Sequence, residues 1–307
     1  MFRNIKALGN TEKRYYFVVL VFSDKLKKEN LKINKNKLSR EITMKLQDRD
    51  YNIILNEEEK RAYEAELAYE AIKGPKNNRG FPRFSHPNKE IREFIWHKRS
   101  LFPNNFLHLI EYKEEYDFEE EAEKFKDVIY NSKNELEIQQ YIKQNKKWFI
   151  PGSVFVDYNF GHHDAYLFPE QKLGNEYAVD YMLIGKNSDG YSIVLVEFEK
   201  ANTEYLLQTR NTESDSVRKG LTQIQDWKRW MDKNRDYFLR NIGLLDYGVD
   251  IPVYRIYYYL VVSRRDFMTP VALEVRSQSI YEMKNTKIVT FDRLSDNIRK
   301  LEKNHSW

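Results

Sequence analysis

The sequence predicts an α/β fold in which a mixed sheet is covered by helices on both sides. Three features of the second half of the chain predict it. They are a pair of apolar runs joined by a polar turn, a long helix after them, and a further apolar run after the helix. Strands that alternate with helices in this order form a sheet with helices packed on its faces.

The apolar runs are the expected strands. Tyr177–Ile184 and Tyr191–Phe198 are separated by a polar segment that begins and ends with glycine, which predicts an antiparallel hairpin. Tyr254–Val262 is apolar on both faces, as central strands of such sheets are. A short strand is expected over Lys287–Phe291. The helices expected around these strands are Asn134–Asn145, about Ser216–Arg240 and Leu294–Lys303.

The first part of the chain predicts a smaller α+β domain. Tyr15–Phe22 is a candidate strand, Glu57–Ile72 is a candidate helix that ends before Gly74 and Pro75, and Ile91–Arg99 predicts a short helix. A strongly acidic stretch, Glu111–Glu123, is expected to connect it to the second domain. The expected domains are residues 1–125 and 126–307.

The composition limits the kind of protein. Of the 307 residues, 41% are hydrophobic and 15% aromatic, which is enough for a sizeable core. Cysteine is absent, which excludes disulfides, cysteine-ligated zinc and thiol catalysis. Tyr15–Phe22, the longest apolar run, is far shorter than the roughly 20 residues of a membrane span. With no signal-peptide pattern at the N-terminus, we expect a soluble cytoplasmic protein without a membrane partner.

The hairpin carries the residues with informative chemistry. If residues 187–190 form its turn, Asp180 and Glu197 are equidistant from the centre and lie directly opposite each other. Opposed residues on neighbouring strands have Cβ atoms about 5 Å apart. Since strand side chains alternate, Glu199 shares a face with Glu197. Three carboxylates are therefore expected in one patch.

Such a patch is costly in a sheet that is buried on both sides. Opposed like charges destabilise a sheet, and unpaired buried carboxylates cost several kcal/mol each. A divalent cation removes the conflict, and hard oxygen ligands favour Mg²⁺ or Mn²⁺. The alternative is an edge hairpin with the three acids in solvent. A one-residue slip of register would also separate the acids onto opposite faces.

These acids and their order resemble the PD-(D/E)xK nuclease superfamily. More closely, residues 135–265 are similar to the Shedu antiphage defence nucleases, which contain domain of unknown function 4263. The N-terminal 125 residues have no counterpart in that resemblance. The segments that carry it are Glu137–Ile142 with Asn145, Val179–Leu183, Leu195–Glu199, Gly220–Trp227 and Val261–Arg265.

The resemblance implies a restriction-endonuclease-like core and a role for each matched residue. Asp180 and Glu197 would be the metal ligands, Glu137 the helix acid that orients a metal-bound water, and Gln223 a polar partner of the nucleophile or phosphate. Glu199 departs from the pattern, because most members have lysine there. Some restriction endonucleases have this Glu-x-Glu form, in which the last Glu is a general base or second-metal ligand. Lys200 does not replace the lysine, because alternation directs it to the opposite face.

Basic residues near these segments are candidate DNA contacts. Arg264 and Arg265 end the predicted central strand, where ligand sites of α/β sheets gather. Arg210, Arg218 and Lys219 are also candidates for phosphate contacts. Solvated surface charge is the alternative for at least half of such residues.

Two other patterns are better explained by structure than by chemistry. His162 and His163 are expected in a polar loop, because no third metal ligand has a suitable spacing. Trp227 and Trp230 are expected to pack in the core. No phosphate-binding loop, dinucleotide fingerprint or hydrolase elbow occurs in the sequence.

The function expected from the acids and the resemblance is a Mg²⁺- or Mn²⁺-dependent DNA endonuclease in antiphage immunity, leaving a 5′-phosphate. The resemblance also implies a homo-oligomer, a tetramer, whose N-terminal domain controls access. Glu199 motivates a second hypothesis, a catalytically silent nuclease fold that binds DNA or a protein partner. Cleavage of RNA in place of DNA is a third.

Overall fold

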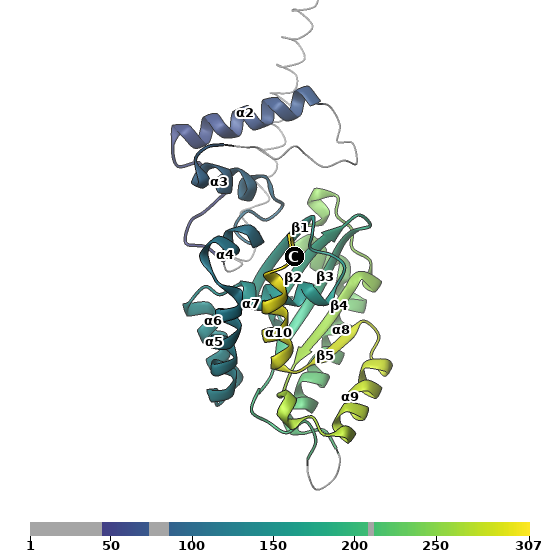
Figure 1. Cartoon of the computed structure of the whole chain (residues 1–307). Helices are drawn as coiled ribbons and strands as arrows, with labels where there is room; N and C mark the ends of the chain where they lie inside the picture. The colour runs from purple at the N-terminus through teal and green to yellow at the C-terminus, as the bar shows by residue number, and fades with distance from the viewer. Residues whose placement is uncertain (1–44, 74–85, 208–211) are drawn as a thin grey trace, which may run out of the picture. The chain divides into compact units, whose positions relative to one another are not determined.

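A five-stranded mixed sheet forms the centre of the described residues, which are 45–73, 86–207 and 212–307 of a computed structural model (Figure 1). The strand order is β1-β2-β3-β4-β5. The first three strands are antiparallel neighbours, and the last three are parallel. The strands are β1 Asp164–Leu173, β2 Tyr177–Asn187, β3 Gly190–Phe198, β4 Ile256–Val261 and β5 Thr286–Val289.

Helices cover both faces of this sheet, as the sequence predicts. One buried cluster lies between the sheet and α5 Phe118–Asn131, α6 Glu135–Gln144, α7 Phe149–Gly152 and α10 Phe291–Leu301, of which α10 lies in front of the strands in Figure 1. The other lies between the sheet and two helices that follow β3 and β4, α8 Asp215–Asn241 and α9 Pro270–Glu282. The predicted mixed sheet between two helical layers is therefore confirmed.

The remaining described helices precede α5. They are α2 Glu57–Lys73, α3 Lys89–Arg99 and α4 Leu109–Glu115, and the first two share a small buried cluster around Phe94. No described helix is long and apolar enough to cross a membrane. Short 3-10 helices occur at η2 Ser153–Asp157, η3 Leu245–Tyr247, η4 Val253–Arg255 and η5 Arg265–Phe267.

The hairpin has the register that its turn predicts. Asn187 pairs with Gly190 and Tyr181 pairs with Val196, so the turn is centred between Ser188 and Asp189. All residues of β3 from Ser192 onward are buried. β2 and β3, the two strands of the hairpin, both lie inside the sheet, which excludes the edge hairpin.

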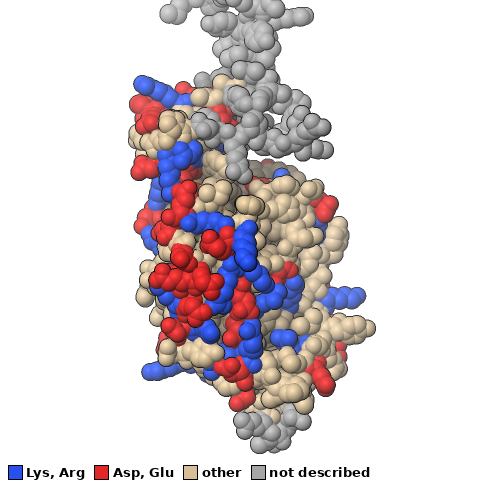
Figure 2. All heavy atoms as spheres, in the orientation of Figure 1, with Lys and Arg blue, Asp and Glu red and all other residues tan. Residues whose placement is uncertain are grey.

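The acidic stretch forms helices where a connector was expected. α4 and α5 contain it, and α5 begins after Asp117, whose side chain accepts hydrogen bonds from two backbone N–H groups of the first turn. Its acids are paired with cations of other elements: Arg299 of α10 contacts Glu119 and Glu123, and Lys147 contacts Glu121. Figure 2 shows the resulting mixture of acidic and basic side chains on this face.

The expected boundary at residues 125 and 126 falls inside α5, and the division into two domains stays a prediction. The strand expected over Tyr15–Phe22 and the candidate Arg210 lie outside the described residues.

A buried aspartate ties the end of η2 to the sheet and to α10. The carboxylate of Asp157 accepts hydrogen bonds from Tyr259 Oη at 2.5 Å, Arg293 Nε at 3.0 Å and Asn297 Nδ2 at 3.1 Å. Burial raises the pKa of Asp157, but the bonds from Arg293 and Tyr259 outweigh it and hold this pKa below its usual range. A carboxylate with a lowered pKa stabilises the fold above its unfolded pKa of about 4.

Asp157→Asn is therefore expected to lower the free energy of unfolding at pH 7 by about 2 kcal/mol, less than for a fully buried ion pair because Arg293 is 44% exposed. The difference from the wild type should shrink as the pH falls below about 4, where the wild-type carboxylate also becomes protonated. Urea unfolding at several pH values measures both effects. Asp236→Asn, at an exposed carboxylate of α8, is the control; equal losses in the two variants would contradict the account.

Candidate active site

The carboxylates predicted to converge lie on the face of the sheet that α8 covers. The β2–β3 pairing ends at Tyr181 and Val196, and the same register continued by one residue puts Asp180 opposite Glu197. Leu195, two residues before Glu197 on β3, packs in the cluster with α8. Glu197 is 5% exposed and Glu199, directly after β3, is 1% exposed. The patch lies at the carboxyl ends of the parallel strands, where ligand sites of α/β sheets gather.

Hydrogen bonds from three elements orient the opposed pair. Asp180 Oδ2 accepts from the backbone N–H of Phe198 at 2.6 Å, and Gln139 of α6 also bonds this carboxylate. Gln223 of α8 bonds the carboxylate of Glu197. The structure therefore brings Asp180, Glu197 and Gln223 together, as the sequence predicts.

Glu199 has a cation as its neighbour. Lys219 Nζ of α8 lies 2.9 Å from Glu199 Oε1 and 3.8 Å from Glu135 Oε1 of α6. Lys219 was a candidate DNA contact, and the structure places its ammonium group among the acids. The backbone N–H of Glu199 continues the β3–β4 pairing by donating to the Val261 carbonyl at 2.9 Å.

A glycine allows α8 to lie this close. A Cβ at Gly220 would be 2.5 Å from Leu260 Cδ1 and 3.2 Å from Glu199 Cγ, closer than side chains pack. The absence of a side chain at position 220 therefore determines how near Lys219 and Gln223 come to the sheet.

Glu137 is not brought into this cluster. It is exposed at the start of α6, where its carboxylate accepts a hydrogen bond from the backbone N–H of Lys133 and its own N–H is capped by Asn134. Glu135 and Gln139 of the same helix face the acids. The sequence carried a signal for them, because with the buried Ile138 and Ile142 they form the i, i+3, i+4, i+7 stripe of a helix's buried face.

The opposed acids resist ionisation. Burial raises the pKa of Glu197 well above its usual range, and the charges of Asp180 and Glu199 raise it further. Burial also raises the pKa of Asp180, although the Phe198 N–H and Gln139 oppose the shift. Lys219 lowers all three values, and Lys200 also lowers that of Glu199, but burial outweighs both cations. The cluster therefore has too little positive charge to offset the burial of its acids.

The donor set is compatible with a small hard cation. Within the described ranges, no three His, Cys, Asp or Glu side chains are grouped so that they could hold a metal ion. A cation at Asp180 and Glu197 would therefore have two carboxylate ligands and complete its shell with backbone oxygen, water or substrate. Mg²⁺ is commonly bound in this way, through one or two carboxylates and substrate phosphate.

The other basic candidates pair with acids outside the cluster. Arg264 is 12% exposed, stacks 4.0 Å above the Tyr130 ring, and pairs with Asp266. Arg265 is 63% exposed and pairs with Asp296, while Arg218 is exposed and pairs with Asp215. Packing explains Arg264, and only Arg218 and Arg265 of these three are open to a ligand.

The histidines and tryptophans that were expected to have structural roles lie where the sequence predicts them. His162 and His163 lie in a loop before β1, with ring centroids 4.5 Å apart. Trp227 and Trp230 are buried beneath the sheet in the α8 cluster.

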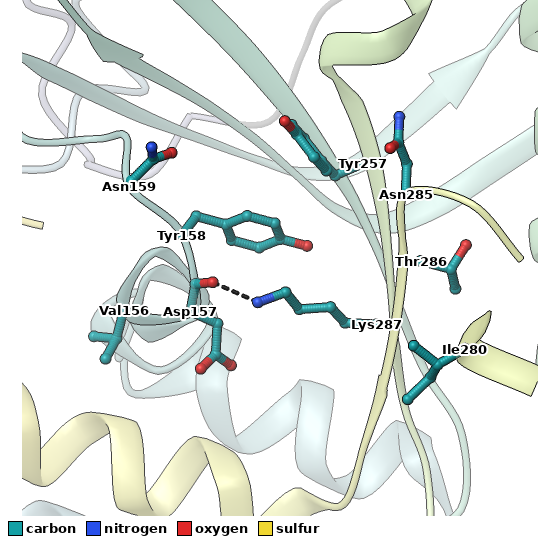
Figure 3. Close-up of a pocket in the computed structure, with 9 residues that line it drawn as sticks. All are labelled: Val156, Asp157, Tyr158, Asn159, Tyr257, Ile280, Asn285, Thr286 and Lys287. Carbon is teal, nitrogen blue, oxygen red and sulfur yellow. Dashed lines mark hydrogen bonds between the residues drawn. The ribbon is translucent and has the colours of Figure 1, made fainter. Parts of the chain in front are cut away.

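A separate hollow lies at the opposite ends of the strands. It has a volume of about 680 Å³ and is lined by residues that include Tyr158, Tyr257 at the start of β4 and Thr286 at the start of β5 (Figure 3). Lys287 Nζ donates across it to the Asp157 carbonyl oxygen. The Asp157 carboxylate is already bound by Arg293 and Tyr259, so this hollow has no opposed acids.

Replacing one of the opposed acids should relieve strain in the metal-free protein. Because the raised pKa values make the native state bind more protons than the unfolded state, stability without metal falls as the pH rises above about 4. In EDTA, Glu197→Gln should flatten this fall and raise the melting temperature at pH 8 by about 2–4 °C. Glu274→Gln, at an exposed acid of α9, is the control. Melting curves of wild type and Glu197→Gln with equal pH dependence would contradict this reading.

Gly220→Ala should separate α8 from the acids. The clash with Leu260 predicts a loss of about 1–3 kcal/mol in the free energy of unfolding, as overpacked cores show. Thr222→Ala, at an exposed position of the same helix, should change stability little. Urea unfolding of both variants tests the close approach, and an unchanged Gly220→Ala midpoint would exclude it.

Comparison with known proteins identifies the family. No curated protein matches the chain. The family model described as Shedu protein SduA, C-terminal, matches residues 132–295, more than half of the chain. The match spans α6, the five strands and α8, and so includes every residue of the acid cluster. The chain therefore belongs to the Shedu protein SduA family.

Proposed function

We propose that this protein is a metal-dependent DNA endonuclease with a PD-(D/E)xK type of nuclease domain. The observation that carries the proposal is the buried, opposed pair Asp180 and Glu197, whose pKa values are raised by burial and by the neighbouring acids. Membership of the Shedu family implies a role in antiphage defence.

Asp180 and Glu197 would hold the cation, Mg²⁺ or Mn²⁺. When bound, such an ion neutralises charge on the scissile phosphate and lowers the pKa of water. The surrounding residues do the positioning. Phe198 N–H and Gln139 fix the Asp180 carboxylate, and Gln223 fixes that of Glu197. Oε1 of Gln223 has no hydrogen-bond partner among the described residues, so it is available to accept from a water or substrate hydroxyl.

We assign the role of the α6 acid to Glu135 in place of Glu137. Glu135 lies on the side of α6 that faces the cluster, and its Oε2 is buried without a hydrogen-bond partner in the described residues. Glu137 instead closes the first turn of the helix. Glu135 would take the proton of an attacking water that lies within hydrogen-bond reach.

DNA is the proposed substrate and partner. Arg218, Lys219 and Arg265 are exposed cations around the carboxyl end of the sheet and would contact phosphates with little sequence preference. From the resemblance we also propose a cytoplasmic homo-oligomer, a tetramer, whose N-terminal region controls access to the site.

Cleavage of supercoiled plasmid tests the function. Wild type with Mg²⁺ or Mn²⁺ should nick or linearise the plasmid, and EDTA should abolish the reaction. Asp180→Asn and Glu197→Gln should each reduce the rate at least about 1000-fold, while Glu274→Gln should cleave like the wild type. Linear duplex, single-stranded DNA and RNA substrates define the nucleic acid.

The alternative is a silent nuclease fold that binds DNA or a protein partner, which the glutamate at position 199 favours. Metal-independent DNA binding that neither Asp180→Asn nor Glu197→Gln affects, without cleavage in any metal, would support it over the enzyme.

A further inference from the structure

Most proteins that the strand sequence resembles have a lysine at position 199, where this chain has a glutamate. Lys219 of α8 lies beside that glutamate and brings an ammonium group to the same place. We propose that Lys219 is the phosphate-contacting cation of this site, and that Glu199 is the residue that positions it. The pair would together do what a lysine at position 199 would do alone. This inference rests on the proposed function, because it assigns a residue to the same site.

The position of the ammonium group supports the proposal. Lys219 Nζ lies between carboxylates of two different elements, Glu199 after β3 and Glu135 of α6. Glu199 is almost fully buried, whereas the Lys219 side chain is 55% exposed. A lysine ammonium group has three donors. Glu199, at 2.9 Å, can use one of them, and Glu135, at 3.8 Å, lies beyond hydrogen-bond distance, so at least one donor is left for a phosphate on the solvent side.

The spacing of helix and strand explains why this lysine can serve. Gln223 bonds Glu197, and Lys219 pairs with Glu199. Four residues of an α-helix rise about 6.0 Å, and two residues of a strand rise about 6.6 Å. A helix antiparallel to β3 therefore delivers one side chain to each acid, and Gly220 gives the helix the necessary close approach.

Neighbouring cations do not fill this role. Lys200 is exposed directly after Glu199, and its backbone carbonyl accepts a hydrogen bond from Ser263. Alternation directs its side chain away from Glu197 and Glu199. Arg218, next to Lys219 on α8, pairs with the exposed Asp215.

The role requires positive charge where a phosphate approaches several acids. Asp180, Glu197, Glu199 and Glu135 would repel DNA, and a fixed cation beside them lowers that repulsion. A cation already in place when charge develops on the phosphate also stabilises the transition state, an effect that is worth about 100-fold or more in kcat.

Relocating the lysine is the sharpest test. Lys219→Ala should lower kcat for plasmid cleavage about 100-fold with a small change in KM, and Lys219→Arg should recover part of the loss. Combining Glu199→Lys with Lys219→Ala places the lysine on the strand. The kcat of this double variant should be at least tenfold higher than that of Lys219→Ala. The neutral pair, Glu199→Gln with Lys219→Met, should stay as slow as Lys219→Ala. Wild-type activity in the neutral pair would show that the lysine only compensates a buried charge, and would overturn the proposal.

A binding measurement keeps the inference separate from the proposed function. DNA affinity is measured in EDTA at several salt concentrations. In Lys219→Ala, the slope of log affinity against log salt should decrease by about the amount that one phosphate contact contributes. Lys233→Ala is the control, an exposed lysine about 21 Å further along α8. Mg²⁺ binding at Asp180 and Glu197 should raise the melting temperature of the wild type, and it should do so equally in Lys219→Ala, because both acids remain.

The outcomes distinguish the two claims. If the wild type never cleaves but Lys219→Ala alters the salt dependence, the endonuclease proposal fails and the phosphate contact stands. If the wild type cleaves and Lys219→Ala keeps both its kcat and its salt dependence, the inference about Lys219 is wrong and the endonuclease proposal stands.

Discussion

Two carboxylates held opposite each other in a buried part of the sheet determine how the residues around them are arranged. The strand register brings Asp180 opposite Glu197 just beyond the last paired residues, and the layer formed by α8 excludes most of the water that would screen them. Each neighbouring polar group, such as the Phe198 N–H or Gln223, directs a hydrogen bond at one of these carboxylates. These bonds hold the acids in position but supply no charge, which is the requirement that a divalent cation meets.

Much of the fold could be predicted because its signals are local. The symmetry of the hairpin about its turn gave the register, and apolar residues on both faces of β4 predicted a central strand. β1 was missed because it contains Pro169 and has charged residues near its end, a pattern unlike that of a buried strand. Proline is tolerated there because β1 is an edge strand. α5 was missed because its acids depend on distant cations such as Arg299, which a local pattern cannot reveal.

The site was predicted where it depends on strand alternation and missed where it depends on packing between elements. Asp180, Glu197 and Glu199 follow from a two-residue period and one turn. The contribution of α6 depends on which side of the helix meets the sheet, and the helical stripe through Ile138 and Ile142 indicates Glu135 and Gln139 where the family pattern indicated Glu137. The partnership of Lys219 with Glu199 joins residues that only the close approach of α8 brings together.

Direct titration of metal tests whether Asp180 and Glu197 together hold one divalent cation. Free Mn²⁺ can be followed by electron paramagnetic resonance as it is added to the full-length protein. We expect one site per chain in the wild type, with affinity at least tenfold lower in both Asp180→Asn and Glu197→Gln. No binding by the folded wild type, or binding that neither substitution weakens, would contradict it.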